Sequence, residues 1–272
     1  PDHLGRATML CRGRFQKGDE MIVAGVDFET NGAELKDLKV TECGASLVDL
    51  SDYREIDTLS TLVYDESYPA QPEHIIELTG ITDEMLKMDG IPPREMLERL
   101  NLFLSQAEYA IAYNRLFDEN VYREICFREN ITPVEIVWIC AYTEVPYPDK
   151  FTCRKLSHLA LDHGIPMDGR ALHRAIDDVR LMFDLLKKYP FDRILAYAKE
   201  PWIFVQAIIP PPWTDGGAGK AAATKRGYGW ERARGTDKPV FSKMWVKRIK
   251  EGQLNTEIKD APFTIAKLNG YT

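Results

Sequence analysis

Apolar positions gather first in three strand-like stretches, at residues 21–28, 39–49 and 57–64. The gaps between these stretches are short, which favours antiparallel pairing of neighbours. Farther along the chain, amphipathic helices alternate with short strands. Helices are expected at residues 93–105, 117–130, 156–163 and 175–188, and strands at residues 109–113 and 136–139. An antiparallel meander followed by alternating helices and strands predicts an α/β fold, in which helices cover the faces of a mixed sheet.

The last part of the chain follows a different pattern and carries a different charge. Residues 201–272 hold 12 Lys and Arg against 6 Asp and Glu, a net charge of +6, whereas residues 1–200 hold 23 against 36, a net charge of −13. Four of the five tryptophans also lie in this last part. It predicts a small α/β module, with strands at 202–209, within 226–249 on either side of a turn at 235–239, and at 263–268, and short helices near 221–226 and 251–260.

These differences in pattern and charge predict that the chain consists of three parts. We expect an N-terminal extension at residues 1–19, a larger domain at 20–200 and a small basic, Trp-rich domain at 201–272. The segment 208–225 combines a proline run with several glycines and predicts a loop or linker. Its sequence GGAGKAAAT is not a phosphate-binding loop, because Thr214 and Ala221 stand where that motif needs Gly and Ser or Thr.

Several classes of protein are excluded by composition. No apolar run approaches the roughly 18 residues of a membrane-spanning helix, and the first twenty residues lack the apolar centre of a secretory signal. A cytoplasmic protein is therefore expected. The five cysteines form no Cys-x-x-Cys pair, so they predict reduced thiols in the core and neither a disulfide framework nor a zinc site.

Two carboxylates stand one residue apart at the end of the first predicted strand, in the sequence GVDFETNG. Side chains alternate between the faces of a strand, so Asp27 and Glu29 project to one side and Phe28 to the other. Like charges this close repel unless a cation neutralises them, and carboxylate oxygens suit Mg²⁺ or Mn²⁺. Taken alone, the same two residues fit surface acids on a fraying strand equally well.

A third carboxylate, Asp118, lies in the first turn of the helix expected at 117–130. An acid in that position commonly complements the helix dipole. However, residues that directly follow a strand line the ligand crevice of α/β sheets. Asp118 follows its strand as closely as Asp27 and Glu29 follow theirs, so it is a candidate for the same site.

The sequence HRAIDD contributes the last candidates. At about 100° per residue, the apolar positions of the helix expected at 175–188 share one face, Asp178 borders that face and Asp177 points to solvent. His173 precedes the helix, so helical phase does not place it, and a lone histidine is more commonly a surface or core residue than a catalyst. A second pair at the same separation, His163 and Asp168, is interrupted by the helix-breaking sequence GIPM.

The sequences VDFETNG, YNRLFDENVY and HRAIDD occur in this order, and together they resemble the three motifs of the DEDDh, or DnaQ-like, 3′–5′ exonuclease superfamily. The resemblance covers about residues 20–190 and is nearest to exonuclease X and polymerase III epsilon-like proteins. LTGITDEML and RKLSHLALDHGI are similar to the segments that precede the second and third motifs of such enzymes. The third motif has a histidine five residues before its last aspartate, which selects His173 with Asp178.

The resemblance implies a ribonuclease H-like fold, with a five-stranded sheet of three antiparallel strands followed by two parallel ones. It implies a metal-dependent 3′–5′ exonuclease that uses two divalent cations, Mg²⁺ or Mn²⁺, and releases nucleoside 5′-monophosphates. Asp27 would bridge both ions, Glu29 and Asp178 would complete the ligands of the first, and Asp118 would hold the second. His173 would take the proton of the attacking water, as suits a residue type whose unperturbed pKa is ~6.5.

The resemblance also implies contacts with the terminal nucleotide. The residues in the matching positions are Phe28, Thr30, Leu78, Thr79, Asn114 and Phe117. Core packing is the alternative role for the two phenylalanines. Asn31 stands where many relatives have Thr, a departure that leaves the acids untouched.

The substrate stays open at this stage between two nucleic acids. Single-stranded DNA ends are favoured, an exoribonuclease of the same fold is the alternative, and a non-catalytic nucleic-acid-binding protein is a further one. Basic and aromatic residues in 201–272 predict an additional nucleic-acid contact, but a protein partner or a tryptophan core fits the same residues.

Overall fold

The computed structural model describes most of the chain, namely residues 21–32, 38–148, 150–151, 153–167, 173–208, 218–231 and 244–268. The chain divides into two units, Pro1–Leu195 and Ala196–Thr272. The division falls inside helix α7, Phe191–Lys199. The extension expected at residues 1–19 lies outside the described residues.

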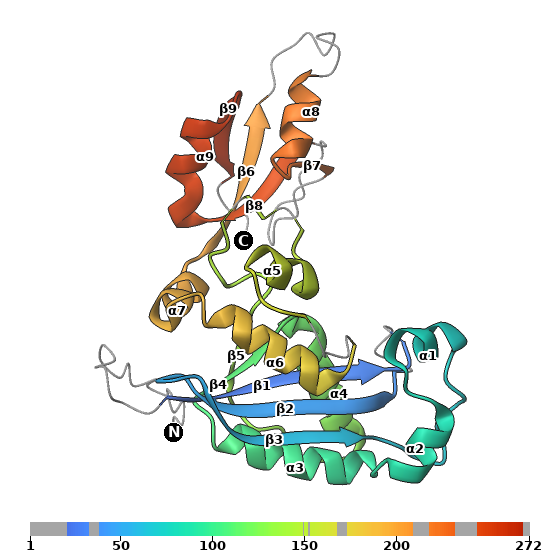
Figure 1. Cartoon of the computed structure of the whole chain (residues 1–272). Helices are drawn as coiled ribbons and strands as arrows, with labels where there is room; N and C mark the ends of the chain where they lie inside the picture. Colours follow the sequence, from blue (N-terminus) through green and yellow to red (C-terminus); the bar gives the residue numbers. More distant parts are fainter. Residues whose placement is uncertain are drawn as a thin grey trace, which may run out of the picture. The chain divides into compact units, whose positions relative to one another are not determined.

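The first unit is built on a five-stranded mixed sheet in the order β3-β2-β1-β4-β5 (Figure 1). Its strands are β1 (Ile22–Thr30), β2 (Val40–Asp49), β3 (Arg54–Leu62), β4 (Tyr109–Ala112) and β5 (Val137–Cys140). β1 pairs antiparallel with β2 and parallel with β4, while β2 pairs antiparallel with β3 and β4 parallel with β5. This arrangement confirms the predicted sheet of three antiparallel and two parallel strands.

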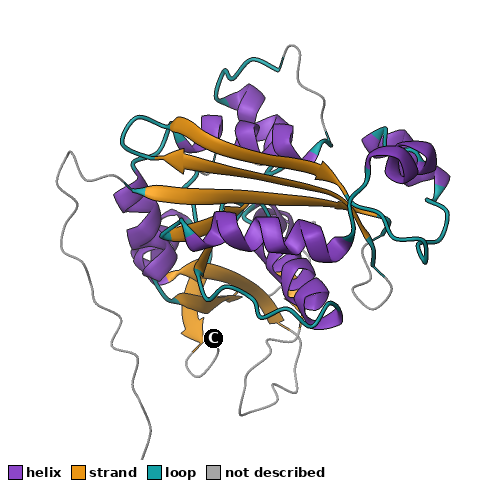
Figure 2. Cartoon of the chain, turned by 90° about the horizontal axis from the view of Figure 1, so that it is seen from below, coloured by secondary structure: helices purple, strands orange, loops and turns teal. Residues whose placement is uncertain are grey.

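Helices cover both faces of this sheet (Figure 2). They are α1 (Glu73–Thr79), α2 (Asp83–Asp89), α3 (Pro93–Ser105), α4 (Arg115–Arg128), α5 (Leu156–Asp162) and α6 (Ala175–Leu186), followed by α7. α3 and α4 pack on one face and α5 and α6 on the other, so the central strand β1 is buried from both sides. The sequence pattern missed α1, α2 and α7, and the first two are only seven residues long.

Two glycines let α6 approach the sheet closely. A β-carbon on Gly25 of β1 would lie 2.4 Å from the Phe183 ring, and one on Gly44 of β2 would lie 2.4 Å from the backbone of Ala175 and Ile176. Such distances are far below ordinary van der Waals contact, so neither strand tolerates a side chain there without displacing the helix. Gly44 therefore admits the first turn of α6 close to β2, and Gly25 admits the side chains of its later turns close to β1.

The second unit contains a four-stranded sheet in the order β7-β8-β6-β9. Its elements are β6 (Trp202–Ile208), α8 (Ala218–Lys225), β7 (Gly229–Glu231), β8 (Met244–Lys250), the 3₁₀ turn η1 (Glu251–Gln253), α9 (Leu254–Asp260) and β9 (Thr264–Leu268). A small core around Val205, Ala223 and Tyr228 holds them together. The turn expected at 235–239 and Trp213 lie outside the described residues.

Two expectations overlap in residues 208–225: the structure confirms the short helix expected near 221–226, and the loop or linker expected at 208–225 is wrong from Ala218 onward. Residues Ala218–Lys225 form α8, and Ala223 is fully buried in the core of the second unit. Three consecutive alanines favour a helix, and burial of its apolar side stabilises it against the glycines that precede it. The segment lies within the second unit and does not separate the two units.

The structure describes four of the five cysteines. Cys43, Cys126 and Cys140 are buried free thiols, and Cys153 is partly buried and also free. Over the described ranges, every helix is too short or too polar to cross a membrane.

Candidate active site

Asp27 and Glu29 lie near the carboxyl end of the central strand β1, both half-buried. Phe28, between them, is 4% exposed and packs in the core on the α3–α4 side. The antiparallel register shifts directly after Glu29, where β2 contains one extra residue. Bulges of this kind bend a strand and re-aim its side chains next to active sites. The period-two alternation thus places the two carboxylates together on the α6 side of the sheet.

Helix α6 brings the third motif to these carboxylates. Ligand atoms of Glu29, His173 and Asp178 all lie within 4.8 Å of one another. The Asp178 carboxylate accepts a hydrogen bond from the backbone N–H of His173, so the first turn of α6 and the turn before it form one local structure. His173 is exposed and has a φ of 61°, in the left-handed region that few side chains adopt. The structure therefore assembles residues that are 144 and 149 positions apart from Glu29 in the chain.

Asp118 joins the site from α4, on the opposite face of the sheet. It lies in the first turn of that helix and is only 2% exposed. The backbone N–H of Phe28 donates to its carboxylate, and Asp27 is close enough for its charge to act on it. Its buried Oδ1 atom has no hydrogen-bond partner among the described residues. A buried carboxylate oxygen without a partner is costly unless a cation or ordered water satisfies it.

The electrostatics of this cluster favour a cation. Burial, together with the charges of Asp178 and Glu42, raises the pKa of Asp27 to about 8. Burial and the Asp27 charge raise the pKa of Glu29 to about 9. Burial also raises the pKa of Asp178 to about 6 and that of Asp118 well above its ordinary value. Hard oxygen donors that resist ionisation in this way form a fitting site for a divalent metal ion, whose charge offsets their repulsion.

A further acid, Glu42, escaped the sequence analysis. It lies on β2 directly opposite Glu29 in the antiparallel register and is 1% exposed. Arg174, the residue after His173, forms an ion pair with it at 2.7 Å. Glu42 is the one charged residue in the interior of the stretch VTECGASLVD, which ends with Asp49, and a charge in the interior of a buried strand is a signal for a paired group. That signal could have identified Glu42, but not its partner 132 residues away.

His163, the alternative to His173, is held in place by hydrogen bonds and ring contacts within the fold. The Nδ1 atom of His163 lies 2.6 Å from the Leu159 carbonyl and its Nε2 atom lies 2.5 Å from the Tyr189 hydroxyl. Its ring also packs against Phe151 and Tyr147. Asp168 lies outside the described residues.

The residues expected to contact substrate divide into buried and exposed groups. Thr30 is buried and donates to the Gly32 carbonyl at 2.6 Å. Thr79 is buried at the end of α1, where its hydroxyl bonds the Ile75 carbonyl and accepts from the Ile81 amide. These hydrogen bonds give both threonines a structural role beside any contact with substrate.

The remaining candidates lie at the surface or near it. Leu78 is 50% exposed at the end of α1, which Figure 1 shows beyond the carboxyl end of β1. Asn114 is exposed before α4, and Phe117 is half-buried against the core on the α3–α4 side. Leu116, which the sequence analysis did not select, is 69% exposed beside them. Exposed apolar side chains at the mouth of an acidic site are suited to contact a base or sugar.

Together, these acids and His173 form a candidate active site at the end of the central strand of a mixed, ribonuclease H-like sheet. The family model described as Exonuclease (RNase_T) matches residues 25–186, and the chain belongs to this exonuclease family. This confirms the DEDDh exonuclease superfamily indicated by the three motifs, and the family implies dependence on a divalent metal.

Solved structures show the same fold. Exonuclease I matches 65% of this chain with a TM-score of 0.56 and 17% identity. The match covers 43% of the exonuclease I chain, so this chain spans less than half the length of that protein. E. coli exonuclease I in complex with a dT13 oligonucleotide matches with a TM-score of 0.59 and 14% identity over 93% of this chain and 67% of that one. The nuclease domain of 3′hExo, a DEDDh family member bound to rAMP, matches with a TM-score of 0.52 and 16% identity over 63% and 92%. A comparison with curated proteins finds no match.

Proposed function

We propose that this protein is a 3′–5′ exonuclease that removes nucleoside 5′-monophosphates from single-stranded nucleic acid, with DNA preferred over RNA, using two Mg²⁺ or Mn²⁺ ions. The buried, unpartnered Oδ1 of Asp118 beside Asp27 is the observation that carries the proposal. It indicates a second cation position apart from the cluster of Glu29, His173 and Asp178. A binding protein without catalysis has no need for acids that repel nucleic acid in the absence of metal.

The roles of the ligands follow from their places. Asp27 acts electrostatically on both Glu29 and Asp118, which suits it to hold both ions. Glu29 and Asp178 would hold the first ion with it, and Asp118 would hold the second. Two such ions supply Lewis-acid stabilisation of the charge that develops on the scissile phosphate and its leaving oxygen.

His173 completes the reaction as the proton acceptor. It is exposed, it lies against Glu29 and Asp178, and general bases act within hydrogen-bond reach of the attacking water. The water oxygen bonds to the terminal phosphorus, one of its protons passes to His173, and the bond from phosphorus to the 3′-oxygen of the preceding nucleotide breaks. The departing 3′-oxygen takes a proton from solvent. The products are a nucleoside 5′-monophosphate and a shortened strand with a free 3′-hydroxyl.

The choice of nucleic acid rests on two kinds of relative. Exonuclease I in complex with dT13 supports DNA, and it matches a larger share of this chain. The 3′hExo nuclease domain bound to rAMP supports the alternative, a 3′–5′ exoribonuclease of the same fold. Both substrates present a terminal phosphodiester, so the same acids would act on either.

Shortening of labelled strands tests the function directly. With Mg²⁺ or Mn²⁺, the wild-type protein is expected to convert 5′-labelled single-stranded DNA into a ladder of shorter labelled products. Parallel reactions with duplex DNA and RNA establish preference, and Asp27→Ala and His173→Ala should give no ladder. If the wild type shortens none of these substrates with either metal, the catalytic proposal is wrong.

We further propose that the second unit, as a basic Trp-rich domain, provides an additional contact for single strands. Trp230 is 48% exposed and stacks near Trp245 at 5.6 Å between ring centroids. Arg248, also exposed, lies 4.9 Å from the centre of the Trp202 ring. Exposed aromatic rings with neighbouring cations suit base stacking and phosphate contact.

Replacement of Trp230 tests this contact in the full-length chain. Because stacking contributes about 1–3 kcal/mol per base, Trp230→Ala should weaken binding of single-stranded DNA roughly 5- to 100-fold. Fluorescence anisotropy in EDTA measures that affinity without degradation. Replacing Ile258, which is 50% exposed on α9, by Ala serves as a matched loss of surface apolar area. Unchanged affinity of the Trp230 variant would favour a protein partner for this unit.

A further inference from the structure

A buried ion pair lies next to the acidic cluster, and none of the proposed chemistry uses it. The Nε atom of Arg174 lies 3.1 Å from both carboxylate oxygens of Glu42, and its Nη2 atom lies 2.7 Å from Oε1. Glu42 is 1% exposed on the buried strand β2. A charge in such a position is costly unless a well-placed partner satisfies it, and the planar fork of arginine provides that geometry.

The same carboxylate holds the beginning of α6. Oε2 of Glu42 accepts a hydrogen bond from the backbone N–H of Ala175, the first residue of the helix, at 3.0 Å. The Arg174 carbonyl in turn accepts the amides of Asp177 and Asp178 at 2.9 and 3.0 Å. A carboxylate from a neighbouring strand thus caps this helix, where no side chain of the N-cap residue Arg174 does so.

The residue that this capping holds in place is His173. Its φ of 61° is unfavourable for a non-glycine residue, so neighbouring contacts must maintain it. Arg174 follows it directly, and Gly44, two residues after Glu42, admits the backbone of Ala175 and Ile176 at close range. Glu42 also faces Glu29 across the β1–β2 ladder. The Glu42 carboxylate therefore bonds to the turn that follows His173, and Glu42 itself lies in the strand pair that carries Glu29.

We propose that Glu42 and Arg174 are positioning residues, which hold the turn at His173 and the first turn of α6 so that His173 and Asp178 face Glu29. They touch neither substrate nor metal and act through those three side chains. The proposal rests on the proposed nuclease function for its kinetic effect, but its effect on metal affinity is independent of it.

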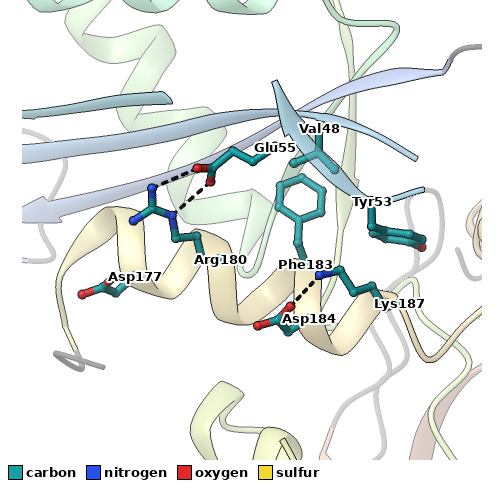
Figure 3. Close-up of a pocket in the computed structure, with 8 residues that line it drawn as sticks. All are labelled: Val48, Tyr53, Glu55, Asp177, Arg180, Phe183, Asp184 and Lys187. Atoms are coloured by element: carbon teal, nitrogen blue, oxygen red, sulfur yellow. Dashed lines mark hydrogen bonds and ion pairs between the residues drawn. The ribbon is translucent and has the colours of Figure 1, made fainter. Parts of the chain in front are cut away.

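A second ion pair between α6 and the neighbouring strands provides a matched control. Arg180, on α6, binds Glu55 of β3 through Nε and Nη2 at 3.0 and 2.9 Å. Figure 3 shows this pair at a pocket of about 390 Å³, whose lining also includes Tyr53, Phe183 and Asp177. The Glu55 pair joins α6 to the sheet as the Glu42 pair does, but it has no contact with His173 or Ala175. Loss of either pair weakens the packing of α6, and only loss of the first should disturb the acidic cluster.

The experiment compares Glu42→Gln, Arg174→Lys and Glu55→Gln in the full-length protein. Loss of a residue that orients metal ligands commonly lowers activity or metal affinity 10- to 100-fold. Glu42→Gln and Arg174→Lys should therefore lower kcat by about that factor and weaken Mn²⁺ binding, measured by calorimetry, by about tenfold. KM should change by less than about threefold, because substrate contacts are untouched. Glu55→Gln should leave kcat and Mn²⁺ affinity near those of the wild type. Thermal unfolding in EDTA records the stability of each variant.

The outcomes separate the possibilities. If Glu42→Gln folds and keeps wild-type kcat and Mn²⁺ affinity, or if Glu55→Gln loses as much of both, the positioning role is wrong. If Glu42→Gln does not fold, Arg174→Lys decides, since it keeps the charge and loses only the bidentate fork. If the wild type hydrolyses no nucleic acid but binds Mn²⁺ more tightly than Glu42→Gln and Arg174→Lys do, the nuclease proposal fails and the positioning role stands.

Discussion

Replacing Asp27 by asparagine is expected to abolish hydrolysis of nucleic acid and, in the absence of metal, to make the folded protein more stable. Asparagine keeps the size of the side chain but removes the charge that would hold both ions. Lewis-acid stabilisation contributes several kcal/mol to such reactions, so the rate should fall by roughly 10³-fold or more. The gain in stability has a separate origin, the burial of the Asp27 carboxylate and its repulsion by Asp178 and Glu42, which together raise the pKa of Asp27.

The gain in stability of Asp27→Asn over the metal-free wild type is expected to increase with pH. The pKa of Asp27 rises from 3.8 to about 8 on folding, so ionisation costs the folded state more than the unfolded state. The metal-free wild type should therefore lose stability as the pH rises from about 4 to about 8, and Glu29, with a pKa of about 9, extends the loss upward. Asp27→Asn removes its own part of this loss. We expect its Tm in EDTA at pH 9 to exceed that of the wild type by roughly 5 °C or more.

The control for this prediction is Asp177→Asn, which removes a carboxylate on the same helix as Asp178. Asp177 lines the pocket of Figure 3 and is not one of the three residues whose ligand atoms converge, although its charge contributes to the raised pKa of Asp178. Its variant should retain activity and show the pH-dependent Tm of the wild type. Saturating Mg²⁺ should raise the Tm of the wild type and of this control, but that of Asp27→Asn much less. Equal loss of Tm with pH in Asp27→Asn and the wild type would contradict the assignment.

Replacing His173 by asparagine is expected to lower kcat by roughly 10²- to 10⁴-fold, the usual contribution of general acid–base catalysis. Asparagine tolerates a positive φ better than most residues, so the backbone turn should persist and the Tm should change little. His173→Ala removes the same imidazole but places a less tolerant residue at a φ of 61°. Single-turnover kinetics with saturating Mn²⁺ measure the chemical step in both variants.

Rescue by imidazole separates chemistry from structure in this second prediction. His173→Gly relieves the backbone strain and leaves room beside Glu29 and Asp178. Added imidazole should then restore part of the lost rate, while Asp27→Asn should not respond. A His173→Asn enzyme with wild-type kcat would show that another group accepts the proton.

Much of the site was predictable because its parts obey local periodicities. Strand alternation places Asp27 and Glu29 on one side of β1 and Phe28 in the core on the other, as the structure shows. Helical phase places Asp178 at the border of the buried face of α6. The three strands, the helices of the first unit that carry motifs and the mixed order of the sheet follow from the same patterns.

Other features were missed for equally physical reasons. α1 and α2 are too short for a helical period to stand out, and their ends depend on local groups such as Thr82 and Gly80. The helix near 221–226 was expected, but the first residues of α8 were assigned to a loop, because the burial of α8 comes from a core formed by distant strands. Glu42 was overlooked because nothing near it in the chain indicates Arg174.

The sequence by itself determined the identity of the acids, the faces on which they lie and the family to which the chain belongs. These properties depend on side-chain spacing within single strands and helices, which a linear pattern records. Only the tertiary structure decided that Asp118 would be buried with an unsatisfied oxygen, that His173 would take a left-handed backbone and that Glu42 would cap α6. Those properties depend on contacts between residues far apart in the chain, whose energies come from burial and charge pairing after the elements have packed.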